Sequence, residues 1–211
     1  MPAWADCGAI QPIVSNPFRA QFGDKFVVMY SGNLGFSQQL DSVLDAAEQM
    51  HSDPRVLFVL IGEGACKEQL LARTAERGLT NVMFLPYQPK EGLGQSLSAA
   101  DLHLIPLAPG TAGCIVPSKV YAILAAGRPF VAMMEQHAEV ARLAREHNVG
   151  FVVSPGDAAG LAGATRKALA HPDLLHQMGS RARGLALERF DRPKVTREFG
   201  DMLANVALMA D

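Results

Sequence analysis

Short runs of apolar residues recur along the chain from residue 24 onward, and most of them close at a glycine or a proline. Runs of about four to eight residues that are rich in Val, Ile, Leu and Phe are typical of strands buried on both faces of a sheet. We therefore expect about six strands, in the segments KFVVMYSG, RVLFVLIGEG, NVMFLP, DLHLIP, PFVAMM and VGFVV.

The residues between these strands have helical periodicity. Apolar residues recur at i, i+3, i+4 and i+7 from Leu40 to Ala47, which places them on one face of an amphipathic helix. After Asp157 the strand pattern stops, and helices fill the chain to about Ala207. Further helices are expected at 66–77, 90–99, 117–126 and 138–147.

Strands that alternate with helices predict β-α-β units and a parallel sheet covered on both faces. The predicted fold is therefore α/β, a Rossmann-like doubly wound parallel sheet of about six strands, with C-terminal helices. Residues 1–23 follow neither period, and we interpret them as a linker or arm before a domain at 24–211. A length of 211 residues fits one domain with such an appendage.

Charge and cysteine content narrow the classes of function. Nineteen basic and 21 acidic residues leave a net charge of −2, which argues against a nucleic-acid partner bound through its phosphates. No apolar run approaches the roughly 18 residues that a membrane span needs, and no secretory signal opens the chain. Three cysteines without C-x-x-C spacing indicate a reducing compartment, hence the cytoplasm, and no residue pattern predicts a metal site.

The long loop after the fourth predicted strand is the strongest candidate for chemistry. In an open parallel sheet, ligands bind beyond the carboxyl ends of the strands. Small residues from Gly110 to Gly113 allow close approach of a ligand, and Ser118 and Lys119 stand in the first turn of the helix expected from Pro117. A cation at that end opposes the helix dipole unless an anion compensates it. The pattern favours a diphosphate cradle, with a solvated surface lysine as the alternative.

Other strand-end loops offer weaker candidates. The SGNLG segment resembles half of a dinucleotide-binding fingerprint, or is simply a tight turn. Glu63, between two glycines, could accept hydrogen bonds from ribose hydroxyls, and the aromatic loop at 87–89 could border a base. Glu135 could bind a polar sugar. Each of these residues could equally be an ordinary exposed or core-facing residue. These candidates are Gly32 and Asn33, Glu63, then Tyr87, Gln88 and Pro89, and finally Glu135.

Several of these segments together resemble a known family. FVVMYSGNLG, FLPYQP, AADLHLIPL, VPSKVYAILAAGRPFVA and GFVVSPGD match in order the C-terminal half of group 1 retaining glycosyltransferases of family 4, which have the GT-B fold. The similarity spans about residues 24–205 and is strongest to colanic-acid-type exopolysaccharide enzymes. PAWAD near the start resembles the connector between the two domains of such enzymes.

The resemblance implies a donor-binding half whose acceptor-binding N-terminal domain is missing from this chain. In the family this half holds a nucleotide-sugar, commonly UDP-linked, and transfers the sugar with retention and without an obligatory metal. The acceptor is a polysaccharide or a lipid-linked sugar at the cytoplasmic membrane face, so any membrane contact requires the full-length protein. By resemblance the diphosphate meets Gly113, Cys114, Ile115, Val116, Ser118 and Lys119 together with Gly32 and Asn33, while Glu63 lies near the nucleoside and Tyr87, Gln88 and Pro89 border the base.

The sequence departs from the family at its charged positions. The paired glutamates common in the family correspond to Cys114 and Ala122, and the usual arginine and lysine correspond to Asn33 and Gln39. Lys119 is then the best candidate for a phosphate-binding cation. Two readings besides a variant donor site stay open: a non-catalytic, degenerate module that binds a partner, and half of a nucleotide-sugar epimerase.

Overall fold

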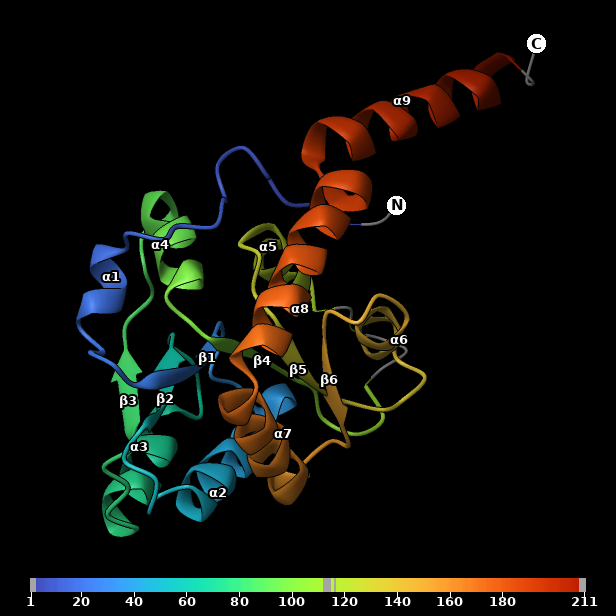
Figure 1. Ribbon diagram of the computed structural model, residues 1–211. Coiled ribbons are helices and arrows are strands. Elements are labelled where there is room, and N and C mark those ends of the chain that lie inside the picture. The colour runs from blue at the N-terminus through green and yellow to red at the C-terminus, as the bar shows by residue number, and fades with distance from the viewer. Residues whose placement is uncertain (1–2, 112–114, 116, 209–211) are drawn as a thin grey trace.

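A computed structural model of the protein describes residues 3–111, 115 and 117–208. Its strands form one parallel sheet of the order β3-β2-β1-β4-β5-β6 (Figure 1), which confirms the predicted doubly wound fold. The strands are β1 (Phe26–Ser31), β2 (Val56–Ile61), β3 (Val82–Leu85), β4 (Leu102–Pro106), β5 (Phe130–Met133) and β6 (Gly150–Val153).

Helices cover both faces of the sheet. In Figure 1, α2, α3 and α7 lie on one face, and α1, α4, α5 and α6 lie on the other. The α-helices are α1 (Pro17–Ala20), α2 (Asp41–Gln49), α3 (Lys67–Glu76), α4 (Leu93–Ser98), α5 (Lys119–Ala125), α6 (Glu139–Glu146), α7 (Ala158–Ala170), α8 (Pro172–Leu185) and α9 (Arg192–Leu208). Shorter turns are the 3-10 segments η1 (Phe36–Gln38) and η2 (Lys90–Gly92) and the π-helical η3 (Ala186–Phe190).

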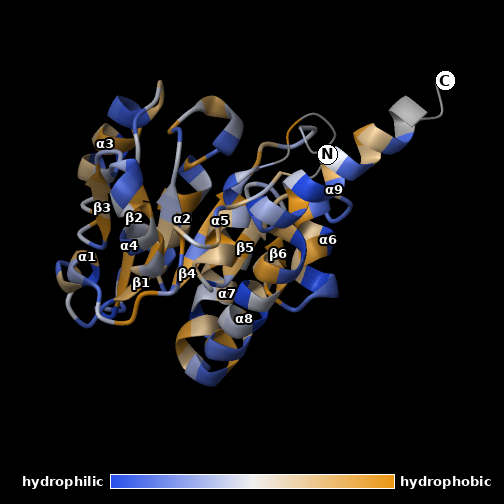
Figure 2. Cartoon of the chain, turned by 90° about the horizontal axis from the view of Figure 1, so that it is seen from above, coloured by the Kyte–Doolittle hydropathy of each residue, from blue (hydrophilic) through white to orange (hydrophobic). Residues whose placement is uncertain are grey.

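The core fills the space between the sheet and each helical layer. Along β1, Val28 and Tyr30 pack with α2 and α7, whereas Val27 and Met29 face the opposite layer. All six residues of β2 are buried, as expected for a strand covered on both sides. Figure 2 shows the consequence: the strands are hydrophobic along their length, and hydrophilic residues are found on the helices and loops around them.

Two predicted helices differ at their ends. The helix expected at 117–126 begins at Lys119, because Pro117 and Ser118 accept only the short i+3 bonds from Val120 and Tyr121 that precede regular helix. The helix expected at 90–99 is divided into η2 and the short α4.

Residues 3–23 pack along the domain rather than hanging free of it. Cys7, Ile10 and Phe22 are buried. The Arg183 guanidinium on α8 donates hydrogen bonds to the carbonyl oxygens of Cys7 and Ile10 at 3.0 and 2.8 Å. The domain boundary expected near residue 24 stays a prediction, because these contacts show only that the arm and the domain form one packed unit.

The arm also pairs with the beginning of the last helix. The Ala5 amide donates to the Phe190 carbonyl, and the Arg192 amide donates to the Ala5 carbonyl, both at 2.9 Å. These bonds form a parallel bridge between Ala5 and Asp191. The arm and the start of α9 are therefore fixed to each other on the surface.

Beyond this bridge α9 projects from the domain (Figure 1). Val195 is buried, and every residue from 196 to 205 is exposed. Phe199, Met202 and Leu203 are 36%, 50% and 53% exposed. Among the described helices, none is long and apolar enough to cross a bilayer.

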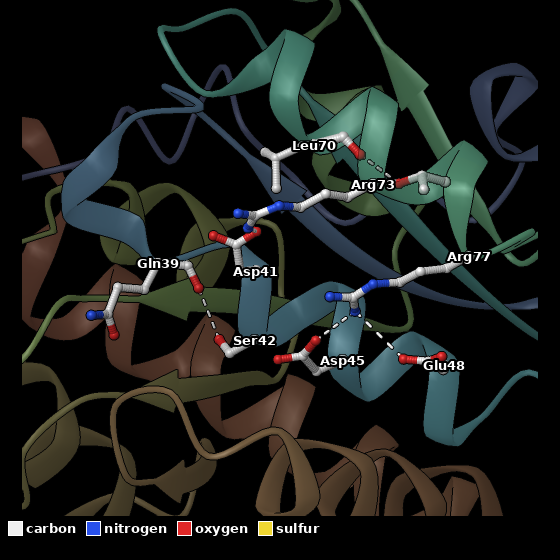
Figure 3. Close-up of polar contacts among 9 residues, drawn as sticks. Gln39, Asp41, Ser42, Asp45, Glu48, Leu70, Arg73 and Arg77 are labelled. Atoms are coloured by element: carbon white, nitrogen blue, oxygen red, sulfur yellow. Dashed lines mark hydrogen bonds and ion pairs between the residues drawn. The ribbon is translucent and has the colours of Figure 1, made fainter.

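Surface ion pairs join α2 to α3 (Figure 3). Arg73 pairs with Asp41, and Arg77 pairs with Asp45 at 2.6 Å and with Glu48 at 3.5 Å. At the start of α2 the Ser42 hydroxyl donates to the Gln39 carbonyl at 2.9 Å. These contacts fix the segment that connects β1 to α2.

Candidate functional site

The strand order creates one topological switch point, between β1 and β4. From β1 the chain continues outward to β2 and β3, whereas from β4 it continues the other way to β5 and β6. Loops that leave the carboxyl ends of β1 and β4 therefore diverge, and ligands of doubly wound sheets bind in the crevice between them. In this chain the two loops are residues 32–35 and 107–118.

Glycines let the loop after β1 pack directly on the loop after β2. A Cβ atom on Gly62 would overlap the carbonyl oxygen of Gly32, and Gly62 has a φ of +148°. The Gly32 amide donates to the Ile61 carbonyl at 2.9 Å, and the Leu34 amide donates to the Glu63 carbonyl at 2.8 Å. Backbone bonds thus hold both loops in place at the edge of the crevice.

Lys119 reaches back from the start of α5 to the loop after β1. Its Nζ atom lies 4.0 Å from the centroid of the Tyr30 ring, and a Cβ atom on Gly32 would overlap this Nζ. Burial lowers the pKa of Lys119 to about 8. No ion pair between described residues includes Lys119, although Lys67 and Lys194 each pair with a glutamate. The positive charge at the switch point is thus free of a carboxylate among these residues.

The other predicted diphosphate residues are only partly placed. Gly113, Cys114 and Val116 lie outside the described residues. Ile115 is exposed, and its amide donates to the Thr111 carbonyl at 3.0 Å. Ser118 is exposed at the N-cap of α5, where its side chain makes no capping bond.

Two of the predicted nucleoside residues lie together. The Tyr87 hydroxyl donates to the Glu63 carbonyl at 3.5 Å, and the Tyr87 ring lies beside Gly62, with 3.5 Å between ring atom Cε1 and the place of a Gly62 Cβ. The Glu63 carboxylate forms an ion pair with Lys67 at 2.6 Å and is half exposed. Glu63 and Tyr87 thus stand side by side at the carboxyl end of β2 and β3.

The next two residues of that loop make local contacts. The Gln88 amide donates to the Pro86 carbonyl at 2.9 Å, and Pro89 is the residue before η2. Among the described residues, neither forms a hydrogen bond with Glu63 or Tyr87, and both adjoin this pair along the chain.

Glu135 supports the loop after β4. Its Oε1 atom accepts a hydrogen bond from the Gly110 amide at 2.5 Å, and this bond lowers the pKa of the carboxyl group. Its Oε2 atom is buried, with no hydrogen-bond partner among the described residues. Glu135 therefore lies at the same carboxyl edge of the sheet as Lys119 and holds the loop after β4. If Glu135 also bound a sugar, it would have to do so while keeping this hydrogen bond or by giving it up.

Tyr30 and Gln38 are not predicted as site residues by the sequence. The apolar pattern places Tyr30 in a strand, and the family resemblance points to Gln39 rather than to Gln38. The Gln38 Oε1 atom is buried without a hydrogen-bond partner, close to where a Gly35 Cβ would be. Gln39 has a φ of 45°, and in Figure 3 its side chain points away from the ion pairs of α2. The available signal was that Tyr30 lies near the carboxyl end of β1 and that Gln38 follows in η1.

A cavity of about 830 Å³ lies at the opposite end of the sheet, between α8 and the strand starts. Its arginines bond to the protein itself. Arg19 pairs with Asp101 at 2.9 Å, Arg128 donates to the Ser98 carbonyl at 2.5 Å, and Arg183 binds three backbone carbonyls. These bonds brace the arm and the sheet, so we place the functional site at the switch point.

Comparisons with known proteins show the family and the fold of the chain. The family model described as Glycosyl transferases group 1 matches residues 15–185. WcaI of Escherichia coli (strain K12), named as a colanic acid biosynthesis glycosyl transferase, is 30% identical over 205 residues, which cover 94% of this chain and 49% of WcaI. The chain thus spans about half the length of this curated relative.

Solved structures share the fold. HepE of Anabaena, in complex with UDP and glucose, superposes with a TM-score of 0.79 at 24% identity, over 95% of this chain and 55% of HepE. Sucrose-phosphate synthase of Thermosynechococcus elongatus superposes with a TM-score of 0.83 at 20% identity, over 99% of this chain and 52% of the synthase. The architecture is that of one half of each protein.

Proposed function

Because this chain belongs to the group 1 glycosyltransferases and has the architecture of their C-terminal GT-B domain, we propose that it binds the nucleotide-sugar donor of a sugar transferase. The observation that carries the proposal is the Lys119 ammonium, held at the switch point without a carboxylate among the described residues. A diphosphate placed there would receive a charge-assisted contact. The same contact would stabilise the negative charge that develops as the diphosphate leaves the sugar.

We propose that the nucleotide is UDP. HepE was solved with UDP and glucose and also with UDP-glucose, which supports this choice. In this chain the Glu63 carboxylate would accept hydrogen bonds from the ribose hydroxyls, and the adjacent Tyr87 ring would border the base. Both residues lie at the carboxyl edge of the sheet, on the β2 and β3 side of Lys119.

We propose further that transfer proceeds with retention to a polysaccharide or lipid-linked acceptor. The name of WcaI supports a role in exopolysaccharide synthesis. A second domain would hold the acceptor and would be the partner that completes the site. Lys119 would supply positive charge to the leaving diphosphate, so we expect no obligatory metal.

A second candidate function is a non-catalytic binding module. At Ala122, one of the two positions where the family resemblance places a carboxylate, the side chain is a methyl group packed against the hydrophobic core. A module of this kind would keep the fold, lose nucleotide affinity and bind another polypeptide.

Calorimetric titration of this chain with UDP, GDP and ADP tests the proposal. We expect UDP to bind selectively. Replacing the lysine in Lys119→Met should raise the UDP dissociation constant by roughly 10- to 150-fold, because one charge-assisted contact is lost. The matched control is Lys167→Met. Lys167 lies on α7, and its ammonium lies over the ring of Phe151 on β6.

The control variant should bind UDP as the unaltered chain does. Absence of binding by all three nucleotides at millimolar concentration would contradict the donor-site proposal and favour the binding module. Equal affinities of the Lys119→Met variant and the unaltered chain would show that the nucleotide binds elsewhere.

A further inference from the structure

The ring of Tyr30 is the group against which the Lys119 ammonium packs. Tyr30 lies near the end of β1, is fully buried, and has its ring centroid 4.0 Å from Nζ. Gly32 supplies the space: a Cβ atom there would overlap Nζ and lie 3.1 Å from the tyrosine hydroxyl. Three residues from two different elements therefore form one arrangement that places the ammonium at the switch point.

The tyrosine is held in a single position and stays neutral. Its hydroxyl donates a hydrogen bond to the Asn33 carbonyl at 2.7 Å, so the ring is fixed at its outer end as well as in the core. Burial raises the pKa of this hydroxyl further above its ordinary value, so Tyr30 does not ionise under Lys119. The ring cannot serve as a counter-ion.

An aromatic ring and a carboxylate hold a lysine in different ways. Lys67 is held by the carboxylate of Glu63 at 2.6 Å, and the two charges cancel. Lys119 is held by a ring, whose negative face attracts the ammonium but carries no net charge. The positive charge of Lys119 therefore stays available to an anion that arrives at the crevice.

We propose that Tyr30 is a positioning residue for donor binding, whose ring holds the Lys119 ammonium in the geometry that meets a nucleoside diphosphate without neutralising it. The inference rests on the proposed function, since it presumes that a diphosphate binds at this crevice. Tyr30 itself touches no substrate in this role. It acts through Lys119 alone.

A fluorinated ring series tests the electrostatic part of the proposal. In the 211-residue chain, Tyr30→Phe is the reference, and phenylalanines with increasing numbers of ring fluorines are incorporated at the same position. Fluorine withdraws electron density from the ring face with little change in shape. We expect the UDP dissociation constant to rise stepwise along the series, by roughly 2- to 30-fold in total.

The same series in the Lys119→Met background separates positioning from packing. We expect fluorination to leave UDP affinity unchanged there, because the cation is gone. A flat series with Lys119 present, or equal slopes in the two backgrounds, would overturn the proposal. Absence of UDP binding by the unaltered chain would instead overturn the proposed function, so the two failures are distinguishable.

A coarser pair of variants guards against loss of the fold. Tyr30→Leu removes the ring, and Phe58→Leu removes another fully buried ring from the same core cluster. Both should lower the unfolding temperature, but only Tyr30→Leu should weaken UDP binding. Equal UDP affinities in these two variants would contradict the inference.

Discussion

At the scale of single residues, Lys119 has a largely buried side-chain amine, and we propose that its charge binds a diphosphate. The pKa of its folded form is about 8, against 10.5 for the ordinary lysine. The unfolded chain therefore holds this proton more tightly than the folded chain does. By linkage, the contribution of Lys119 to the free energy of unfolding rises as pH increases from about 8 to 10.5.

Binding of a diphosphate should show the opposite trend. Only the charged lysine attracts the anion, so we expect UDP affinity to stay constant from pH 7 to about 8 and then to fall by up to about tenfold per pH unit. Above pH 8, binding should take up a proton. Calorimetry in buffers of different ionisation enthalpy measures both effects. The Lys119→Met variant should give a flat profile, and a flat profile in the unaltered chain would contradict the prediction.

Gly62 is the residue whose replacement should most directly disturb the loop contact. Gly62→Ala introduces a Cβ that overlaps the Gly32 carbonyl, at a φ of +148° that other residues rarely adopt. We expect a loss of at least about 2 kcal/mol in the free energy of unfolding, measured by urea titration.

The comparison variant is Gly163→Ala, in the middle of α7, where a Cβ meets nothing within 4 Å. Alanine favours the helix over glycine, so this change should stabilise the protein by about 0.5–1 kcal/mol. If the free energy of unfolding changed in the same direction in both variants, loop strain at Gly62 and helix propensity at Gly163 would not be the dominant effects.

The sequence predicted Lys119 but missed Tyr30 for a physical reason. A lysine in the first turn of a helix is unusual by itself, because it opposes the helix dipole. A tyrosine inside an apolar strand is not unusual, and its contact with Lys119 crosses from β1 to α5. Such a contact is defined only once the strand order is known.

At the scale of elements, Arg183 on α8 joins the arm to the domain. Its guanidinium donates to the carbonyls of Cys7, Ile10 and Ala125 at 2.7–3.0 Å. Arg183→Met should lower the free energy of unfolding by about 2–4 kcal/mol, because three carbonyls lose a charged donor. Chemical denaturation measures this loss.

Arg181 is the matched control on the same helix. Among the described residues it donates to the Asn148 carbonyl alone, at 2.9 Å on the exposed surface, so Arg181→Met should lower the free energy of unfolding by less than about 1 kcal/mol. Similar losses in the two variants would show that Arg183 does not hold the arm.

Elements were predicted well where the hydrophobic pattern determines them and less well where long-range contacts do. All six strand segments were located, because buried parallel strands are continuous apolar runs. The sequence predicts no regular structure for the arm because the contacts that fix the arm are long-range: Cys7 and Ile10 are buried, and their carbonyls accept hydrogen bonds from Arg183, which follows 176 and 173 residues later. The pattern of apolar and polar residues within 1–23 does not reveal these long-range contacts.

At the scale of the whole molecule, the packed domain ends before α9 does. Residues from 196 to 205 are exposed throughout. Removing residues 196–211 should therefore change the free energy of unfolding by less than about 1 kcal/mol, measured by urea titration. Phe190→Ala should lower the free energy of unfolding by more, about 3–5 kcal/mol, because Phe190 is buried and its ring centroid lies 4.8 Å from that of Tyr121. A larger loss from the truncation than from Phe190→Ala would contradict this picture.

The site also belongs to this scale, and that limits what a sequence can reveal. Strand and helix assignments implied a crevice at some switch point. Which two loops border this crevice follows from the order β3-β2-β1-β4-β5-β6, and that order brings Gly32 beside Lys119. The sequence identified candidate residues singly, but it did not identify which of them lie in contact with one another.

The bridge between Ala5 and Asp191 has a mechanical consequence. Its partners run parallel, so tension applied outward along the arm and along α9 loads the bridging hydrogen bonds in shear, all at once, rather than peeling them apart. The same two segments are also joined by the Cys7 amide, which donates to the Asp191 carboxylate at 3.1 Å, and by the pair of Arg192 with Asp6 at 3.2 Å. A load applied to both segments would therefore be carried by these contacts before it reached the strands of the sheet.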